Sequence, residues 1–273
     1  MTDHYAVFGN PISHSKSPDI HRAFAAATGQ DMAYGMIEPP VDGFEQALAD
    51  FIAQGGRGCN ITVPFKLDAF AAATERRPSA EQAGASNCLK VEADRIIAEN
   101  FDGIGLVRDL QDNHAANLAG KRVLLLGAGG ATRGVVVPIL QTGAASVTIA
   151  NRSVDKAIEL AMLFGDEGNV QGCGYGDLTG PPFDIVINGT SASLTAQRLP
   201  LPPQVFAAGC LAYEMVYGKG MTPFLLQAKE AGTTRIADGV GMLVEQAAEA
   251  FAWWRGVRPV TAPVIADLTV PLT

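Results

Sequence analysis

The sequence is short of the features that define several classes of protein. It has no apolar run long enough to cross a membrane, and its 20 Lys and Arg are outnumbered by 28 Asp and Glu, for a formal net charge of -8. A polyanion binds a basic surface, so we expect neither a nucleic-acid partner nor a membrane span. With 273 residues, of which 48% are hydrophobic and 18% charged, the chain suits a globular enzyme of one or two domains.

Cysteine is also scarce. The four cysteines, Cys59, Cys88, Cys173 and Cys210, form no C-x-x-C pair, and none stands beside a His at metal-ligand spacing. We therefore expect reduced thiols and no metal. Residues 1–5 are polar and lack the apolar core of a secretion signal, so we expect a cytoplasmic protein.

The first hundred residues alternate between strand-like and helix-like segments. Ser17 is the expected N-cap of a helix that has Pro18 in its first turn, and Asp42 with Glu45 forms a capping-box pattern before a second helix. The pattern predicts strands at residues 5–8 and 59–63, helices at 18–28 and from 44 to about 52, and a hairpin of strands at 86–91 and 95–98.

The middle of the chain has a different pattern. Residues 123–126, 147–150 and 185–187 are unbroken apolar runs with helix-like stretches between them, and a last helix is expected at 242–254. Continuous apolar strands that alternate with helices indicate a parallel sheet covered on both faces. The predicted fold class is therefore α/β.

A glycine-rich loop follows the first of these apolar runs. Gly127-Ala128-Gly129-Gly130-Ala131 leads into a helix expected at residues 134–141, and Thr132 stands where the usual G-x-G-x-x-G has its last glycine. Glycines let a backbone approach a pyrophosphate, and a helix N-terminus offers free N–H groups to it. An ordinary strand-to-helix turn is the alternative, but the strand, helix and second strand in sequence favour a dinucleotide site.

The end of the second apolar strand indicates which dinucleotide. An NAD site has Asp or Glu there for the ribose 2′-OH. This chain has Asn151-Arg152-Ser153 and then Lys156, which suit a 2′-phosphate. A solvated basic turn is the alternative. The sequence therefore predicts NADP as cofactor.

Polar motifs gather in the first hundred residues. Hydroxyls in Ser13-His14-Ser15-Lys16-Ser17 stand at a helix start and could hold a carboxylate, although simple capping would also explain them. Asn60 and Thr62 share one face of a strand, with Lys66 just beyond it. A Lys and an Asp that converge near a nicotinamide suit carbonyl reduction, because the new alkoxide needs a proton or a positive neighbour.

Together these segments resemble the shikimate dehydrogenase family over nearly the whole chain. Residues 9–18 resemble its opening motif, residues 60–66 its N-x-T-x-P-F-K motif, residues 84–87 its G-A-x-N motif, and residues 100–103 its N-T-D-G motif. Residues 188–191, 222–224 and 238–246 resemble three later motifs.

The resemblance implies a set of functional residues. The implied catalytic residues are Lys66 and its partner Asp102. The implied substrate residues are Ser15, Ser17, Thr62, Asn87, Tyr217 and Gln246. The implied cofactor residues are Gly127, Ala128, Gly129, Gly130, Ala131, Asn151, Arg152, Ser153, Lys156, Thr190, Met215 and Gly239.

The chain departs from the family pattern at a few positions, namely Pro78, Cys88, Phe101, Gly189 and Ser193. Phe101 matters most because it replaces a Thr next to Asp102. If residues 100–102 alternate as in a strand, the ring points into packing and changes nothing. If the ring instead enters the substrate cleft, it displaces Asp102 and slows the reaction. The second placement is the one we expect, because Phe101 is at a strand end.

The resemblance also implies a complete architecture and activity. We expect a substrate domain at residues 1–103, completed by 239–273, and a Rossmann-type NADP domain at 104–238, with a cleft between them. The implied activity is the NADP-dependent interconversion of 3-dehydroshikimate and shikimate by a monomer or homodimer. Two alternatives remain: a quinate- or aminoshikimate-type dehydrogenase of the same family, and a non-catalytic NADP-binding protein.

Overall fold

The computed structural model describes residues 2–273, which form two compact units. The first unit comprises Met1–Asp102 with Val244–Val264, and the second Gly103–Leu243 with Ile265–Thr273. Each unit contains a six-stranded sheet with helices around it, so the predicted α/β fold class is confirmed. In the structure, residues 239–243 and 265–273 belong to the second unit. The predicted division placed all of residues 239–273 in the first.

The sheet of the first unit is mixed, with strand order β2-β1-β3-β5-β6-β4. β1 runs parallel to β2 and β3, whereas β5 is antiparallel to both β3 and β6. Its elements are β1 (Asp3–Phe8), α1 (Ser17–Thr28), β2 (Met32–Ile37), α2 (Phe44–Ala53), β3 (Gly56–Ile61), α3 (Lys66–Ala72), β4 (Glu75–Arg76), α4 (Pro78–Ala83), β5 (Cys88–Glu92) and β6 (Arg95–Glu99).

Two expected helix caps are wrong. Ser17 is the first residue of α1 and Lys16 is its N-cap, with no side-chain capping bond. The helix ends at Gly29, whose φ of 64° is a left-handed conformation that glycine adopts without strain. The Asp42–Glu45 capping box does not form either, because α2 begins at Phe44 behind Gly43, again without a side-chain cap. Burial of Phe44 and Leu48 fixes this helix instead.

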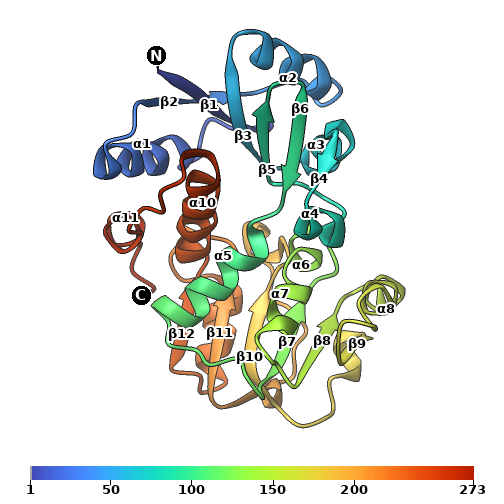
Figure 1. Cartoon of the computed structure of the whole chain (residues 1–273). Helices are drawn as coiled ribbons and strands as arrows, with labels where there is room; N and C mark the ends of the chain where they lie inside the picture. The colour runs from blue at the N-terminus through green and yellow to red at the C-terminus, as the bar shows by residue number, and fades with distance from the viewer. Residues whose placement is uncertain (1) are drawn as a thin grey trace. The chain divides into compact units, whose positions relative to one another are not determined.

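The sheet of the second unit is parallel, with strand order β12-β11-β10-β7-β8-β9 (Figure 1). The chain starts at β7 and moves outward in one direction to β9, then returns to β10 and moves in the other. Its strands are β7 (Arg122–Leu126), β8 (Ser146–Ala150), β9 (Val170–Cys173), β10 (Phe183–Asn188), β11 (Phe206–Glu214) and β12 (Arg235–Asp238). This order has a switch point between β7 and β10, where open parallel sheets bind their ligands.

Helices cover both faces of this sheet. They are α6 (Gly130–Arg133), α7 (Val136–Gln141), α8 (Val154–Leu163) and α9 (Pro223–Glu230), with a π-helical turn at Asp109–Asn113 and 3-10 turns at Tyr175–Asp177, Ala192–Thr195 and Pro203–Val205. Three further helices have residues in both units: α5 (Asp102–Arg108), α10 (Val240–Arg255) and α11 (Ala262–Leu268). The helix expected at 134–141 begins earlier, at Gly130, and is interrupted between α6 and α7.

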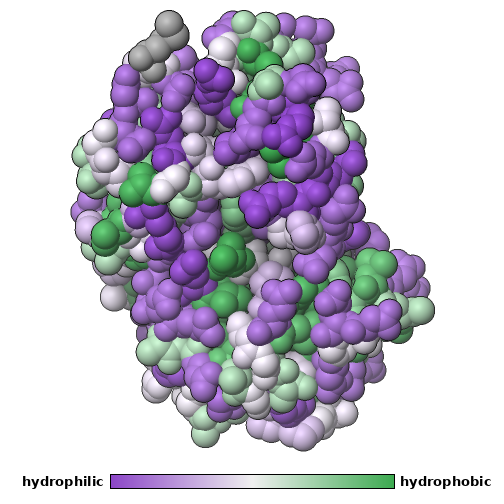
Figure 2. Space-filling model, in the orientation of Figure 1, coloured by the Kyte–Doolittle hydropathy of each residue, from purple (hydrophilic) through white to green (hydrophobic). Residues whose placement is uncertain are grey.

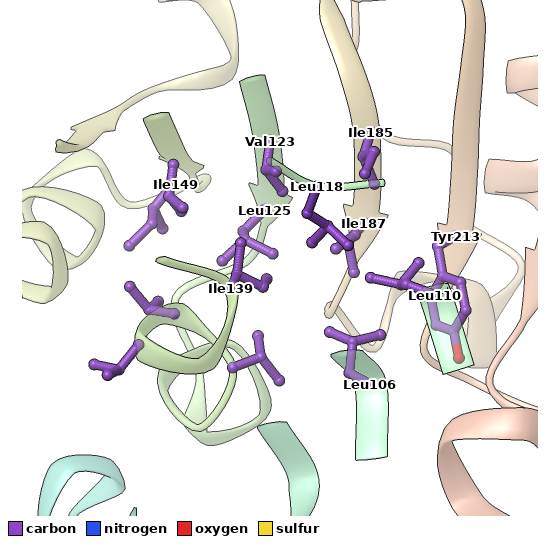
Figure 3. Packing of buried hydrophobic residues seen from close by; sticks show 14 of the residues in the cluster. Leu106, Leu110, Leu118, Val123, Leu125, Ile139, Ile149, Ile185, Ile187 and Tyr213 are labelled. Carbon is purple, nitrogen blue, oxygen red and sulfur yellow. The ribbon is translucent and has the colours of Figure 1, made fainter. Parts of the chain in front are cut away.

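The core on one face of the parallel sheet is almost entirely aliphatic. Leu125, Ile149 and Ile187 from three strands meet Leu106 and Ile139 from the covering helices (Figure 3). Tyr213 carries a hydroxyl into this core, and that hydroxyl donates to Asp109 Oδ2 at 2.6 Å. Such buried polar groups need partners, so the Tyr213–Asp109 bond holds the π-helical turn onto the sheet.

On the face shown in Figure 2, apolar residues lie in several small groups among hydrophilic and neutral ones, and α8 also carries exposed apolar side chains. Val154, Ile158 and Met162 are exposed at a spacing of four residues, whereas Ala157 and Ala161 of the same helix are buried against the sheet. α8 is therefore apolar on both sides. Within residues 2–273, no helix combines the length and the apolar character that a membrane span requires.

Candidate active site

The polar motifs of the first unit meet at one edge of its sheet. β1 and β3 are parallel, so the segments that follow them lie at the same edge. β5 is antiparallel to β3, with Cys88 opposite Asn60, so the start of β5 lies there too, as does the end of β6. This topology brings Thr62, Asn87 and Asp102 together from segments far apart in the chain.

An ion pair stands at the centre of this edge. Lys66 Nζ lies 2.5 Å from Asp102 Oδ2, with 27% of the Lys66 side chain and 11% of the Asp102 side chain exposed. Lys66 begins α3 and Asp102 begins α5, so each side chain is fixed at a helix start. The ammonium is held on one side by the carboxylate and is open to solvent on the other, which lets it donate to a substrate oxygen.

Two asparagines fix Asp102 in turn. Asn87 Nδ2 donates to Asp102 Oδ1 at 2.7 Å, and Asn87 Oδ1 accepts from the Phe101 backbone N–H at 2.9 Å. Asn100 Oδ1 accepts from the Asp102 backbone N–H at 3.1 Å. Both oxygens of the carboxylate are therefore bonded, one to Lys66 and one to Asn87, which fixes its orientation.

Gln246 lies beside this cluster. Its Oε1 accepts a weak bond of 3.4 Å from Asn87 Nδ2, and it comes from α10 within the first unit. The remaining residue implied for the substrate, Tyr217, follows β11 in the second unit. Burial raises the pKa of Tyr217 above its usual value, so its hydroxyl is a donor at neutral pH.

The two serines after β1 connect to a buried polar chain. The Ser17 backbone N–H donates to Ser15 Oγ at 3.3 Å, and the Ser17 hydroxyl bonds to Tyr34. Tyr34 donates to Asn60 Oδ1 at 2.7 Å, and His21 Nε2 lies 3.1 Å from the same oxygen. Because that oxygen can only accept, Nε2 carries the proton of His21.

Sequence reasoning missed Tyr34 and His21. Burial lowers the pKa of His21 to about 3, so the ring is neutral. His21 and Tyr34 stack with ring centroids 4.2 Å apart. A lone His at a helical position and a Tyr on a strand give no signal in the sequence. The pairing of β1 with β2 and β3 brings Tyr34 to Asn60, and the packing of α1 brings His21 there.

Thr62 is half-buried directly after β3, and it lies against the turn that follows β1. A Cβ at Gly9 would come within 2.5 Å of Thr62 Cγ2 and 2.7 Å of Ile12 Cδ1. Only glycine fits that position, so the Gly9-Asn10-Pro11 turn packs directly against Thr62.

Phe101 packs into the interior of the first unit. Its ring lies edge-on to Trp253 at 5.7 Å, in a buried cluster with Tyr5, Cys88 and Trp254. The expectation that the ring enters the substrate cleft is therefore wrong. The alternative, in which the ring points into packing, is the one that the structure shows, although a helix starts at Asp102 and residues 100–102 do not continue as a strand.

The glycine loop of the second unit follows β7 directly. Gly127 has φ of 101°, a left-handed conformation, and a Cβ there would lie 3.0 Å from Thr190 Cγ2. At Gly129 and Gly130 an added Cβ would meet no atom within 4 Å, so the outer side of the loop is open. Ala128 and Ala131 are partly exposed beside them. A tight turn with an open outer side is what a pyrophosphate requires.

The turn after β8 carries the positive charge that the sequence indicated. Arg152, Ser153 and Lys156 are exposed, and Asn151 Nδ2 donates to the Ser153 backbone oxygen at 3.0 Å. β8 is next to β7, so this turn lies beside the glycine loop at the carboxyl edge of the sheet. Its donors fit a phosphate, and the strand ends in no carboxylate that would repel one.

Three more residues implied for the cofactor meet on the opposite side of the glycine loop. Thr190 contacts Gly127. The Met215 backbone N–H donates to the Asn188 backbone oxygen at 3.0 Å. A Cβ at Gly239 would lie 2.3 Å from the Met215 backbone oxygen, so only glycine fits there. These residues follow β10, β11 and β12 in turn. The structure thus brings every residue implied for the cofactor to the carboxyl edge of one sheet.

Family models match three segments of the chain. The model of the shikimate dehydrogenase substrate binding domain matches residues 7–89, that of shikimate / quinate 5-dehydrogenase residues 109–197, and that of the shikimate 5′-dehydrogenase C-terminal domain residues 239–266. A curated protein of Dechloromonas aromatica (strain RCB), named shikimate dehydrogenase (NADP(+)), is 54% identical over 272 residues, which are 100% of this chain and 99% of that protein.

The chain belongs to the shikimate dehydrogenase family.

Solved structures resemble the chain over its whole length. An Ael1 enzyme from Pseudomonas putida superposes with a TM-score of 0.96 at 55% identity, with 100% of each chain covered. Shikimate 5-dehydrogenase from Thermus thermophilus, solved in complex with NADP(H) and shikimate, gives a TM-score of 0.86 at 29% identity over 98% of each chain. The predicted membership of the shikimate dehydrogenase family is confirmed.

Proposed function

We propose that this chain is an NADP-dependent shikimate dehydrogenase, which interconverts 3-dehydroshikimate and shikimate in the shikimate pathway of aromatic amino acid biosynthesis. The names of the full-length relatives bear out the predicted activity and the predicted cofactor. The observation that carries the proposal for this chain is the Lys66–Asp102 ion pair, fixed by Asn87 and Asn100 at the edge where the substrate motifs meet.

The proposed chemistry is a carbonyl reduction and its reverse. When bound, NADPH supplies the hydride that adds to the carbonyl carbon. Lys66 gives its proton to the carbonyl oxygen, so the products are an alcohol and NADP⁺, and the amine regains a proton from solvent. Asp102 aims the ammonium and stabilises its charge between turnovers. The 27% exposure of Lys66 supports this role, because proton recovery needs access to water.

The proposed substrate contacts follow the layout of the first unit. Ser15 and Ser17 hold the substrate carboxylate with Thr62, while Asn87 and Gln246 bind ring hydroxyls. Two features support this assignment: the packing of Thr62 on the turn at Gly9 and the bond from Asn87 to Gln246. Tyr217, which follows β11, is proposed as a further hydroxyl donor to the substrate.

The proposed cofactor contacts follow the layout of the second unit. Residues 127–131 hold the pyrophosphate through backbone N–H groups, and Arg152, Ser153 and Lys156 hold the 2′-phosphate. Thr190, Met215 and Gly239 line the remainder. We also propose a cytoplasmic location and a monomeric or homodimeric state, as the sequence predicted.

A four-way assay tests the proposal. Initial rates are measured with shikimate and with quinate, each with NADP⁺ and with NAD⁺. The expected result is a strong preference for shikimate with NADP⁺. A kcat/KM that is higher with quinate than with shikimate would show that the chain is a quinate-type dehydrogenase of the same family. An absence of turnover with all four combinations would favour a non-catalytic NADP-binding protein.

A further inference from the structure

A buried carboxylate at the end of β11 lies outside every contact described so far. Glu214 is 0% exposed, and the groups that donate hydrogen bonds to it are neutral. An isolated carboxylate in a protein interior is costly unless several donors satisfy it. Glu214 has four: Asn188 Nδ2 at 3.0 and 3.2 Å, Ser193 Oγ at 2.5 Å, Thr222 Oγ1 at 3.0 Å and the Val216 backbone N–H at 3.3 Å.

These donors belong to three separate segments at the carboxyl edge of the sheet. Asn188 and Ser193 flank the loop after β10, Val216 follows β11, and Thr222 is the N-cap of α9, where its Oγ1 accepts from Leu225 N–H. One carboxylate therefore ties together two loops and a helix start. Loops at a sheet edge are otherwise the most mobile parts of such a fold.

The bonds have a fixed direction. Asn188 presents its Nδ2 to Glu214, so its Oδ1 must face the other way, where it accepts from both the backbone N–H and the hydroxyl of Thr190 at 3.1 and 2.7 Å. Glu214 thereby determines which way the Asn188 amide points. The amide in turn determines the position of Thr190, which lies against Gly127 of the glycine loop.

The order of the strands shows which half of the coenzyme would lie near Thr190. β8, with Arg152 at its end, lies on one side of β7, whereas β10 and β11 lie on the other. A dinucleotide bound across the switch point has its adenosine half over β8 and its nicotinamide half over β10 and β11. Thr190 and Met215 thus belong to the nicotinamide side.

We propose that Glu214 is a positioning residue for the nicotinamide half of the coenzyme, acting through Asn188 on Thr190 and through Val216 on the segment at Met215. This inference rests on the proposed function, because it takes NADP as the ligand.

Glu214→Gln is the sharpest test because it keeps the shape of the side chain. Its new NH₂ group would face Asn188 Nδ2 whichever way it turns, since that nitrogen bonds to both carboxylate oxygens. The hydroxyls of Ser193 and Thr222 can rotate to accept. Asn188 Nδ2 keeps one oxygen as acceptor but loses the other and faces a donor in its place. The Asn188 amide is then held less firmly, and so is Thr190, which bonds to Asn188 Oδ1.

The experiment measures two affinities by titration calorimetry. NADPH spans both halves of the site, while adenosine 2′,5′-bisphosphate occupies only the adenosine half. We expect Glu214→Gln to bind NADPH about 10-fold more weakly, the loss of one well-placed contact, and to bind the bisphosphate as the wild type does. Val205→Ala, a core change in the same unit at a buried residue, is the control for lost stability and should leave the ratio of the two affinities unchanged.

The outcomes separate the inference from the proposed function. If Glu214→Gln weakens both ligands equally or neither, the positioning role is wrong while the function stands. If the wild type binds neither ligand, the proposed function itself fails. Should Glu214→Gln not fold, Ser193→Ala removes a single donor at a partly exposed position. Ser193→Ala should weaken the binding of NADPH by about 3-fold and leave the binding of the bisphosphate unchanged. An unchanged ratio of the two affinities in this variant would also overturn the inference.

Discussion

Asp102 of the first unit and Glu214 of the second are both acceptors at the carboxyl edge of a sheet, but only Asp102 lies beside a cation. Asp102 bonds to Lys66 and keeps part of the pair in contact with solvent. Glu214 is sealed among neutral donors, and burial raises its pKa. A group that exchanges a proton with substrate needs water and a charged partner, whereas a group that holds loops in place needs neither.

In the proposed function, the first unit carries the chemistry and the second binds the coenzyme. Changes in the first site should therefore lower kcat, and changes in the second should weaken the coenzyme. Buried residues outside both sites should alter only stability.

Lys66→Ala should lower kcat by at least ~100-fold while the KM for NADP⁺ changes little, because it removes a positioned proton donor. Asp102→Asn should act in the same direction, and the double variant should lose less than the product of the two. Steady-state rates with shikimate provide the measurement. Lys90→Ala is the matched control, because Lys90 also pairs with a carboxylate and its side chain is 25% exposed. A near-normal kcat in the Lys66→Ala enzyme would show that Lys66 is not the proton donor.

Phe101→Thr should lower the free energy of unfolding by about 2–4 kcal/mol, because it removes a buried ring from the cluster with Trp253 and Trp254. With the ring inside the core, kcat on shikimate should stay within about 3-fold of the wild-type value, since changes away from the reacting groups leave transition-state contacts intact. Urea unfolding and initial rates measure the two quantities. A clear rise in kcat after this change would mean that Phe101 acts on the site after all.

Arg152→Asp should raise the KM for NADP⁺ by about 30-fold, because it removes a charge-assisted bond to the 2′-phosphate and introduces repulsion. The KM for NAD⁺, which has no such phosphate, is the internal control and should change little. Rates with both coenzymes at saturating shikimate give the answer. Equal losses for the two coenzymes would show that Arg152 does not read the phosphate.

His21 should make stability depend on pH in a defined direction. Burial lowers its pKa to about 3, while an unfolded histidine titrates near pH 6.5. As the pH falls below about 6.5, His21 binds a proton in the unfolded chain but not in the folded one. The free energy of unfolding is therefore highest above pH 6.5 and decreases as the pH falls toward 3.

The comparison variant is His21→Gln, whose Nε2 can still donate to Asn60. The stability advantage of the wild type over this variant should shrink by about 1.4 kcal/mol between pH 7 and pH 5.5. Denaturant titrations at the two values measure it, and the other titrating groups cancel in the difference. An advantage that stays constant would show that His21 is accessible to protons when folded.

Several parts of this protein could be predicted from the sequence because the responsible signal is local. The runs before Gly127 and Arg152 are apolar because their strands are buried on both faces, and the glycine loop between them needs residues without side chains. Lys66 and Asp102 stand in long motifs of the shikimate dehydrogenase family, which predicted them as partners, and their side chains form an ion pair. The caps at Ser17 and Asp42 failed, although their residue types were right, because burial of neighbouring side chains decided where each helix begins.

What only the tertiary structure decided is which distant groups share a partner. Strand pairing brings Tyr34 to Asn60, and the packing of α1 brings His21 to the same oxygen. Glu214 bonds to Asn188, Ser193 and Thr222 because the connections after β10 and β11 meet at one sheet edge. Phe101 points into the core because Trp253 and Trp254, which are distant in the sequence, pack around its ring. The sequence alone determined the two α/β sheets, the glycine loop and the residue types of the reaction. A hydrogen bond, however, depends on atoms meeting within about 3 Å, and residues far apart in a chain reach that distance only after the fold has formed.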